Sequence, residues 1–129
     1  MTEIKLGNTL VGDGHPCYVI AEIGINHNGD IEVAKKLIDV AAAANCQAVK
    51  FQKRTVEVVY PAEELARPRE SPFGMTNGDL KHGLEFGLEQ YREIDRYCRE
   101  KGIHAFVWEL FDGRQGLQTK GARISSGEG

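Results

Sequence analysis

The chain has 129 residues, of which 41% are hydrophobic and 27% are charged, and its formal net charge is −3. This composition is typical of one globular domain with a hydrophobic core, and it excludes a disordered or fibrous chain. The balance of 16 basic against 19 acidic residues argues against a general nucleic-acid-binding surface, which requires clustered positive charge.

The sequence also lacks the patterns of membrane insertion and secretion. It contains no run of about 18 apolar residues that could span a bilayer. Its first 17 residues have neither the basic start nor the apolar centre of a secretory signal. Cys17, Cys46 and Cys98 lack the spacing of a disulfide framework or a zinc site, and we interpret them as small core residues. We therefore expect a cytoplasmic protein that binds neither membranes nor nucleic acids.

The first half of the chain predicts three strands and a helix. Residues 3–12 predict two short strands joined by a turn, and residues 18–23 predict a third strand before a glycine-rich turn. Asp30 is a favourable N-cap for a helix that ends near Asn45, which suits a left-handed C-terminal position. The apolar face of this helix is expected to comprise Val33, Ala34, Leu37, Ile38, Ala41 and Ala42.

The second half predicts two further strands around a long connection. Residues 48–52 form the first of these strands, and residues 53–78 then show no sustained period. A connection this long in a compact domain is typical of a lid or a binding loop. Helix is predicted from Asp79 to Phe86 and is expected to continue after Gly87 until Gly102 ends it, and residues 103–108 predict the last strand.

The order strand, helix, strand, helix, strand predicts right-handed crossovers and a parallel sheet in an α/β fold. The tail, residues 112–129, contains five glycines and lacks the apolar period of a further crossover helix. We expect this tail to be irregular, and a truncated or frame-shifted reading of a longer gene would explain it.

Three polar side chains are predicted to share one face of the sheet. Side chains two residues apart on a strand lie on the same face of the sheet. Glu22 therefore lies on the face opposite to Ala21 and Ile23, and Lys50 and Gln52 share one face of the next strand. Ligands of α/β sheets bind at the carboxyl ends of the strands, where these residues lie. A Glu22–Lys50 pair that only joins two strands is the alternative, but such pairs contribute little stability. We favour a functional site.

Other polar residues carry weaker indications. His27 follows the glycine turn and is a candidate for either a ligand contact or a role within the loop. The remaining histidines do not cluster, so no metal site is predicted from this chain. Four basic residues could hold an anion if the long connection folded over the strand ends, namely Lys53, Arg54, Arg67 and Arg69.

Four blocks, "AEIGINHNGD", "AVKFQKRT", "RPRESPFG" and "LEFGLEQYREIDRYCREKGI", resemble the N-terminal part of the sialic acid synthases. This family comprises the N-acetylneuraminate, legionaminate and pseudaminate synthases, and the resemblance covers residues 1–106. It implies a (β/α)8 TIM barrel, of which this chain supplies the first three or four strands after an N-terminal β-hairpin. It also implies a transferase that condenses phosphoenolpyruvate with N-acetylmannosamine or a related amino sugar and releases phosphate.

The resemblance assigns roles to individual residues. Glu22 corresponds to the essential carboxylate of the family, and Lys50 and Gln52 correspond to its phosphoenolpyruvate contacts. "RISSGEG" resembles a stretch on the fourth strand, which makes Ser126 a phosphate contact and Glu128 a sugar contact, unless a glycine-rich tail matches by chance. Mn²⁺ or Mg²⁺ is implied, with ligands outside this chain, and a homodimer is expected for the full-length protein.

Two other functions stay open. The chain could be a non-catalytic fragment or module that binds an anion or a sugar, or part of another phosphoenolpyruvate-dependent synthase on the same barrel. "NHNG" and "FQKRT" favour the sialic acid branch over the latter. The residues present do not specify which nonulosonic acid is made.

Overall fold

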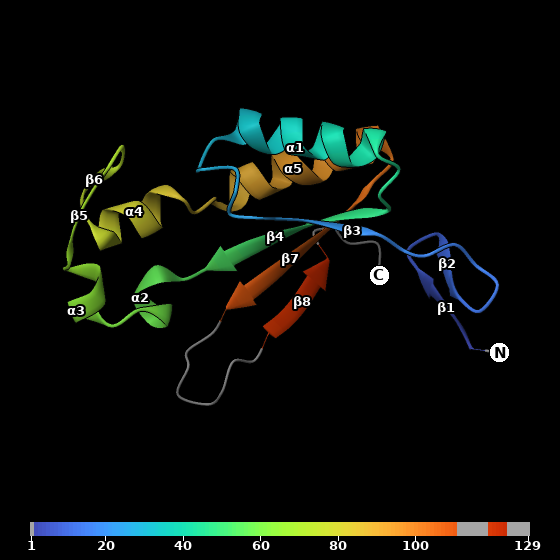
Figure 1. Ribbon diagram of the computed structural model, residues 1–129, viewed down its shortest axis with the longest axis horizontal. Coiled ribbons are helices and arrows are strands. Elements are labelled where there is room, and N and C mark those ends of the chain that lie inside the picture. The colour runs from blue at the N-terminus through green and yellow to red at the C-terminus, as the bar shows by residue number, and fades with distance from the viewer. Residues whose placement is uncertain (1, 111–118, 124–129) are drawn as a thin grey trace.

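The computed structural model describes residues 2–110 and 119–123. Its N-terminal strands, β1 (Glu3–Leu6) and β2 (Thr9–Gly12), pair antiparallel as a hairpin. The hairpin precedes the main sheet in the chain and lies beside the end at which β3 begins (Figure 1).

The main sheet has four strands in the order β3, β4, β7, β8. The first three are parallel: β3 (Ile20–Gly24), β4 (Ala48–Arg54) and β7 (His104–Leu110). Because their order in the sheet follows their order in the chain, right-handed crossovers place the connecting helices on one face. Figure 1 shows these helices, α1 (Ile31–Ala43) and α5 (Leu88–Lys101), side by side over the sheet. The predicted parallel sheet is confirmed.

Local sequence accounts for both long helices. The Asp30 carboxylate accepts a hydrogen bond from the Glu32 backbone N–H at 2.8 Å and caps α1, and Asn45 adopts a left-handed φ of 61° just after it. Gly102 ends α5 with a φ of 71°. These predicted boundaries are confirmed.

The core lies between the two helices and the sheet. Ala34, Ile38 and Ala41 of α1 and Tyr91, Ile94 and Cys98 of α5 are buried there. From the sheet come the residues that alternate with Glu22 and Lys50, namely Ala21, Ile23, Val49 and Phe51. The predicted division of the strand faces is therefore confirmed. Cys98 is buried in this core and Cys46 packs against it partly buried, whereas Cys17 lies on the exposed segment before β3 and is not a core residue.

The connection after β4 is not an unstructured loop. It contains five short elements: α2 (Val56–Val59), α3 (Ala62–Leu65), β5 (Pro68–Ser71), β6 (Gly74–Thr76) and α4 (Asn77–Gly83). We call residues 55–87 the excursion, and it lies beyond the end toward which β4 points (Figure 1). The four elements before α4 have only three or four residues, too few to show a period, which is why residues 53–78 were predicted as a loop.

The helix predicted from residue 79, which was expected to continue after Gly87, is two separate helices. α4 begins at a capping box in which Thr76 and Asp79 exchange hydrogen bonds, and it ends at Gly83. Helix α5 begins anew after Gly87, whose backbone N–H donates to the Gln90 side chain at 2.7 Å. The break allows the chain to turn from the excursion back onto the sheet.

The last strand, β8 (Thr119–Arg123), pairs antiparallel with β7. Part of the tail expected to be irregular is therefore a strand, and it is not a fourth parallel strand. The physical reason is length, because only residues 111–118 separate the two strands. A parallel crossover requires about a dozen residues or more, whereas an antiparallel return does not.

Candidate functional site

The predicted pair of Glu22 and Lys50 is the centre of the candidate site. The two residues are direct partners in the parallel register of β3 and β4, and Lys50 Nζ lies 2.6 Å from Glu22 Oε2. The Glu22 side chain is 54% exposed and the Lys50 side chain is 25% exposed, on the sheet face that the helices do not cover. The carboxylate therefore remains accessible to a ligand in this chain.

Gln52 joins this pair around the glycine that ends β3. A Cβ atom at Gly24 would lie 3.2 Å from Glu22 Oε1 and 4.0 Å from Gln52 Oε1. The carboxylate and the amide oxygen thus flank the same small space, which a side chain at Gly24 would reduce. The register shifts between Glu22 and Gly24, as at a β-bulge, and such irregularities redirect side chains at strand ends. The structure brings together the three site residues that were predicted on these strands.

The other two predicted contacts, Ser126 and Glu128, lie outside the described residues, so their roles stay predictions. Within the described part of the chain, no group of three or more His, Cys, Asp or Glu side chains could hold a metal ion. The described residues of this site therefore do not form a metal centre by themselves.

His27 has a role within the loop that follows β3. Its side chain is buried, its ring stacks on Phe86 with centroids 3.8 Å apart, and its Nδ1 accepts a hydrogen bond from the Gly29 N–H at 3.0 Å. Burial, together with repulsion from the Arg54 guanidinium, lowers the pKa of His27 to about 4. The ring is therefore neutral near pH 7 and carries its proton on Nε2. No hydrogen-bond partner of Nε2 lies among the described residues.

Arg54 does not contribute to an anion clamp, contrary to the prediction. Its side chain is only 4% exposed, and its Nε donates to Glu85 Oε1 at 2.8 Å. Arg67 pairs with Glu64 at the surface of the excursion. Sequence reasoning missed Glu85, because 31 residues separate it from Arg54 and no periodic pattern links them.

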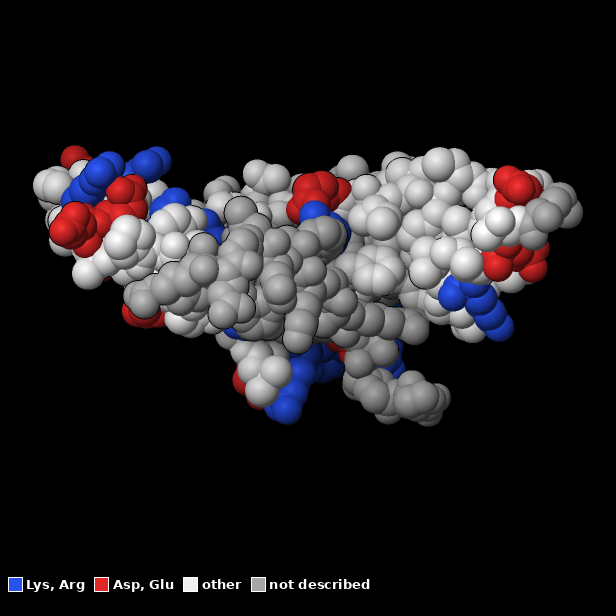
Figure 2. All heavy atoms as spheres, turned by 90° about the horizontal axis from the view of Figure 1, so that it is seen from below, with Lys and Arg blue, Asp and Glu red and all other residues white. Residues whose placement is uncertain are grey.

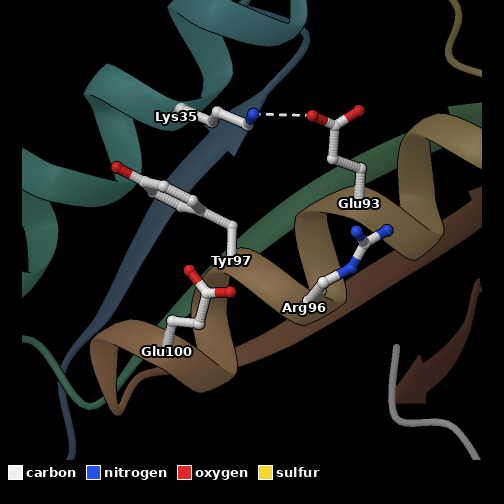
Figure 3. Close-up of a pocket in the computed structure, with 5 residues that line it drawn as sticks. All are labelled: Lys35, Glu93, Arg96, Tyr97 and Glu100. Carbon is white, nitrogen blue, oxygen red and sulfur yellow. Dashed lines mark hydrogen bonds and ion pairs between the residues drawn. The ribbon is translucent and has the colours of Figure 1, made fainter.

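A separate hollow of about 110 Å³ lies on the outer side of the two long helices (Figure 3). In it Lys35 of α1 donates to Glu93 of α5 at 2.6 Å, which raises the pKa of Lys35 and lowers that of Glu93. Tyr97 donates to Asp39 at 2.6 Å. These groups satisfy one another across the helix contact, so we interpret the hollow as a helix–helix junction.

The charges visible on the molecule are mixed. Figure 2 shows Lys and Arg side chains interspersed with Asp and Glu at the end formed by the excursion, without a broad basic patch among the coloured residues. None of the helices described by the structure has the length and apolar character needed to cross a membrane.

Comparison with known proteins decides the family. The sequence profile of the NeuB family matches residues 37–114, which is more than half of the chain. The chain belongs to the NeuB family. The relatives that it matches include the N-acetylneuraminate-9-phosphate synthase of Homo sapiens, 46% identical over 95 residues that cover 72% of this chain and 26% of the relative. The N,N'-diacetyllegionaminic acid synthase of Campylobacter jejuni is 59% identical over 97 residues, covering 73% and 29%.

Solved structures agree with this NeuB assignment. The N-acetylneuraminic acid synthetase of Leptospira borgpetersenii, solved in complex with citrate, superposes with a TM-score of 0.63 and 32% identity. The match covers 84% of this chain and 34% of that one. The mixed α/β fold is thus similar to that of a sialic acid synthetase. The chain spans about a quarter of the length of the curated relatives named above.

Proposed function

We propose that this chain carries part of the active site of a synthase that joins phosphoenolpyruvate to N-acetylmannosamine or a related amino sugar. The observation that carries the proposal is the convergence of Glu22, Lys50 and Gln52 on the face of β3 and β4 that the helices leave uncovered. Relatives named as synthases of N-acetylneuraminate-9-phosphate and of diacetyllegionaminic acid support it. The sheet with helices on one face supports a place in the first part of a (β/α)8 barrel.

The charges of the pair suit this chemistry. Phosphoenolpyruvate carries a carboxylate and a phosphate, and the Lys50 ammonium would offset part of their charge. The Gln52 amide would orient the same substrate by hydrogen bonding. Exposed ion pairs contribute only about 0–1 kcal/mol to stability, so joining β3 to β4 does not account well for this pair.

Glu22 would act where positive charge develops. When carbon 3 of phosphoenolpyruvate bonds to the aldehyde carbon of the open-chain sugar, the aldehyde oxygen takes a proton and carbon 2 becomes electron-deficient. A carboxylate can stabilise that carbon and accept a proton from the water that adds to it. Cleavage of the bond between carbon 2 and the phosphate oxygen then gives the 2-keto acid and free phosphate.

The variant Glu22→Gln, made in the complete protein, tests this role. We expect turnover to fall about 100-fold or more, since a general base or charge-stabilising group is lost. Phosphoenolpyruvate binding, measured by calorimetry, should persist because Lys50 and Gln52 remain. Glu100→Gln, which removes an exposed acid on α5, is the control and should leave both unchanged. Near-normal phosphate release by Glu22→Gln would refute the catalytic assignment.

A further inference from the structure

Arg54 ties the end of β4 to both ends of the excursion. At the far end, its backbone N–H donates to Glu85 Oε2 at 3.0 Å and its Nε donates to Glu85 Oε1 at 2.8 Å. At the near end, its Nη1 donates to the Tyr60 hydroxyl at 2.8 Å. One buried side chain therefore fixes two segments of the excursion against the strand that carries Lys50 and Gln52.

A second contact ties the same end of the excursion to the loop after β3. Phe86, which follows Glu85, stacks on the ring of His27. The Nδ1 of His27 in turn accepts the hydrogen bond of the Gly29 backbone N–H, within the loop that begins after β3 ends at Gly24. The residue pair 85–86 is thus joined to the carboxyl end of β4 through Arg54 and to that of β3 through His27.

We infer that Arg54 is a positioning residue of the synthase site. Acting through Glu85 and Tyr60, it holds the ends of β3 and β4 and the excursion as one rigid unit, so that Lys50 and Gln52 keep the spacing that phosphoenolpyruvate requires. The inference rests on the proposed function. To the three residues of the proposed site it adds Arg54, the last residue of β4, which touches no substrate.

The burial of this ion pair supports positioning over simple stabilisation. The Arg54 and Glu85 side chains are 4% and 12% exposed, and buried charges are desolvated at a cost that apolar residues of similar size avoid. The pair also leaves Arg54 Nη2 buried without a partner among the described residues. An apolar pair could fill the same space, but it could not bond to the backbone of β4 and to Tyr60 together.

The test separates stability from geometry. Arg54→Met leaves Glu85 buried without its partner and should lower the melting temperature. Arg54→Met combined with Glu85→Leu removes both charges and should restore it, as apolar replacement of a buried ion pair commonly does. Although its stability is restored, we expect the paired variant to have a KM for phosphoenolpyruvate about tenfold higher than that of the unmodified protein, with kcat changed less than threefold.

Hydrogen exchange gives a readout that does not depend on turnover. In the paired variant, amide protection in residues 55–84 should fall about tenfold or more, because the excursion is no longer tied at both ends. Tyr60→Phe deletes only the hydrogen bond at the near end, and it should loosen residues 56–65 while leaving the ion pair intact. This milder variant carries the test if the paired variant does not fold.

The control is an ion pair of equal length at the surface. Arg92 Nη1 and Glu89 Oε1 also lie 2.8 Å apart, but both side chains are mostly exposed. Arg92→Met with Glu89→Leu should change neither KM nor exchange in residues 55–84. A paired Arg54 and Glu85 variant with unchanged KM and exchange would overturn the positioning role alone. Absence of any product from the unmodified complete protein would instead overturn the proposed function beneath it.

Discussion

At the scale of single residues, the same chemical types serve opposite purposes in this chain. Glu22 and Lys50 form an ion pair that stays open to solvent, whereas Arg54 and Glu85 form one that is almost fully buried. Only the first can meet a ligand directly. The second determines where the strand ends and the excursion lie, and His27 extends that framework as a neutral buried ring.

His27 makes stability depend on pH. Its pKa falls from an ordinary 6.5 to about 4 in the folded chain, so between these values the unfolded chain binds a proton that the folded chain does not. The free energy of unfolding should therefore decrease as pH falls from 6.5 to 4, by roughly 3 kcal/mol when the titration is complete. Urea unfolding at several pH values measures this.

His27→Phe is the informative variant for that pH dependence. It keeps an aromatic ring against Phe86 and should reduce the decrease across the window. His82→Gln, at an exposed histidine, should not. An equally steep decrease in His27→Phe would show that other groups cause it.

Sequence reasoning at this scale succeeded where the cause is local. The two-residue alternation of a strand is enough to place Glu22, Lys50 and Gln52 on one face, and the register then brings the first two into contact. The partners of Arg54 and His27 come from residues 60, 85 and 86, and nothing near either residue in the sequence indicates them. Tertiary packing alone determines these contacts.

At the scale of elements, the excursion packs closely against the loop after β3. A Cβ atom on Gly29 would lie 2.0 Å from the carbonyl oxygen of Gly83, at the end of α4. Phe73, at the tip of the β5–β6 hairpin, covers both glycines. Close backbone approach of this kind requires glycine, and it explains why "HNG" and "KHG" both end in that residue.

Gly29→Ala should therefore destabilise the protein more than glycine geometry alone predicts. Gly14 has a similar φ of 80°, against 75° at Gly29, but nothing lies within 4 Å of its Cβ position. Gly14→Ala should cost about 1 kcal/mol for the left-handed backbone. Gly29→Ala should cost about 1–3 kcal/mol more, because the α4 backbone must move. Equal shifts in the urea midpoint of the two variants would contradict this packing.

The predictability of the elements follows their length. α1 and α5, with 13 and 14 residues, show several helical periods and clear caps, and both were placed correctly. The elements of the excursion are held by a capping box, by a short hairpin and by contacts with the strand ends. The elements before α4 leave no period to detect, so residues 53–78 were predicted as a loop, whereas helix was predicted from residue 79.

At the scale of the whole molecule, the described chain leaves apolar surface uncovered. β3 is an edge strand of the main sheet, and Val19, Ile20 and Val40 near it are 46%, 47% and 67% exposed. A largely apolar groove of about 250 Å³ runs between β3 and α1. Unpaired strand edges beside apolar surface promote association between chains.

The 129-residue chain expressed alone should therefore self-associate. Its apparent mass by light scattering should rise with concentration. Ile20→Lys with Val40→Lys places one charge on the edge strand β3 and one in the groove, and should shift the chain toward monomer. Leu88→Lys changes an exposed apolar residue on α5 and serves as the control. A chain that stays monomeric throughout the series would show that this surface is not adhesive.

The excursion leaves and rejoins the rest of the fold at nearly one point, since the Arg54 backbone is hydrogen-bonded to the Glu85 carboxylate. A segment whose ends meet can be lengthened, shortened or exchanged while its flanks stay the same distance apart, and the entropy of closing it changes only slowly with length. Excursions of different length and sequence could thus form different recognition surfaces beside the same sheet. Evolution could alter what is bound above the strands without disturbing how Glu22 faces Lys50.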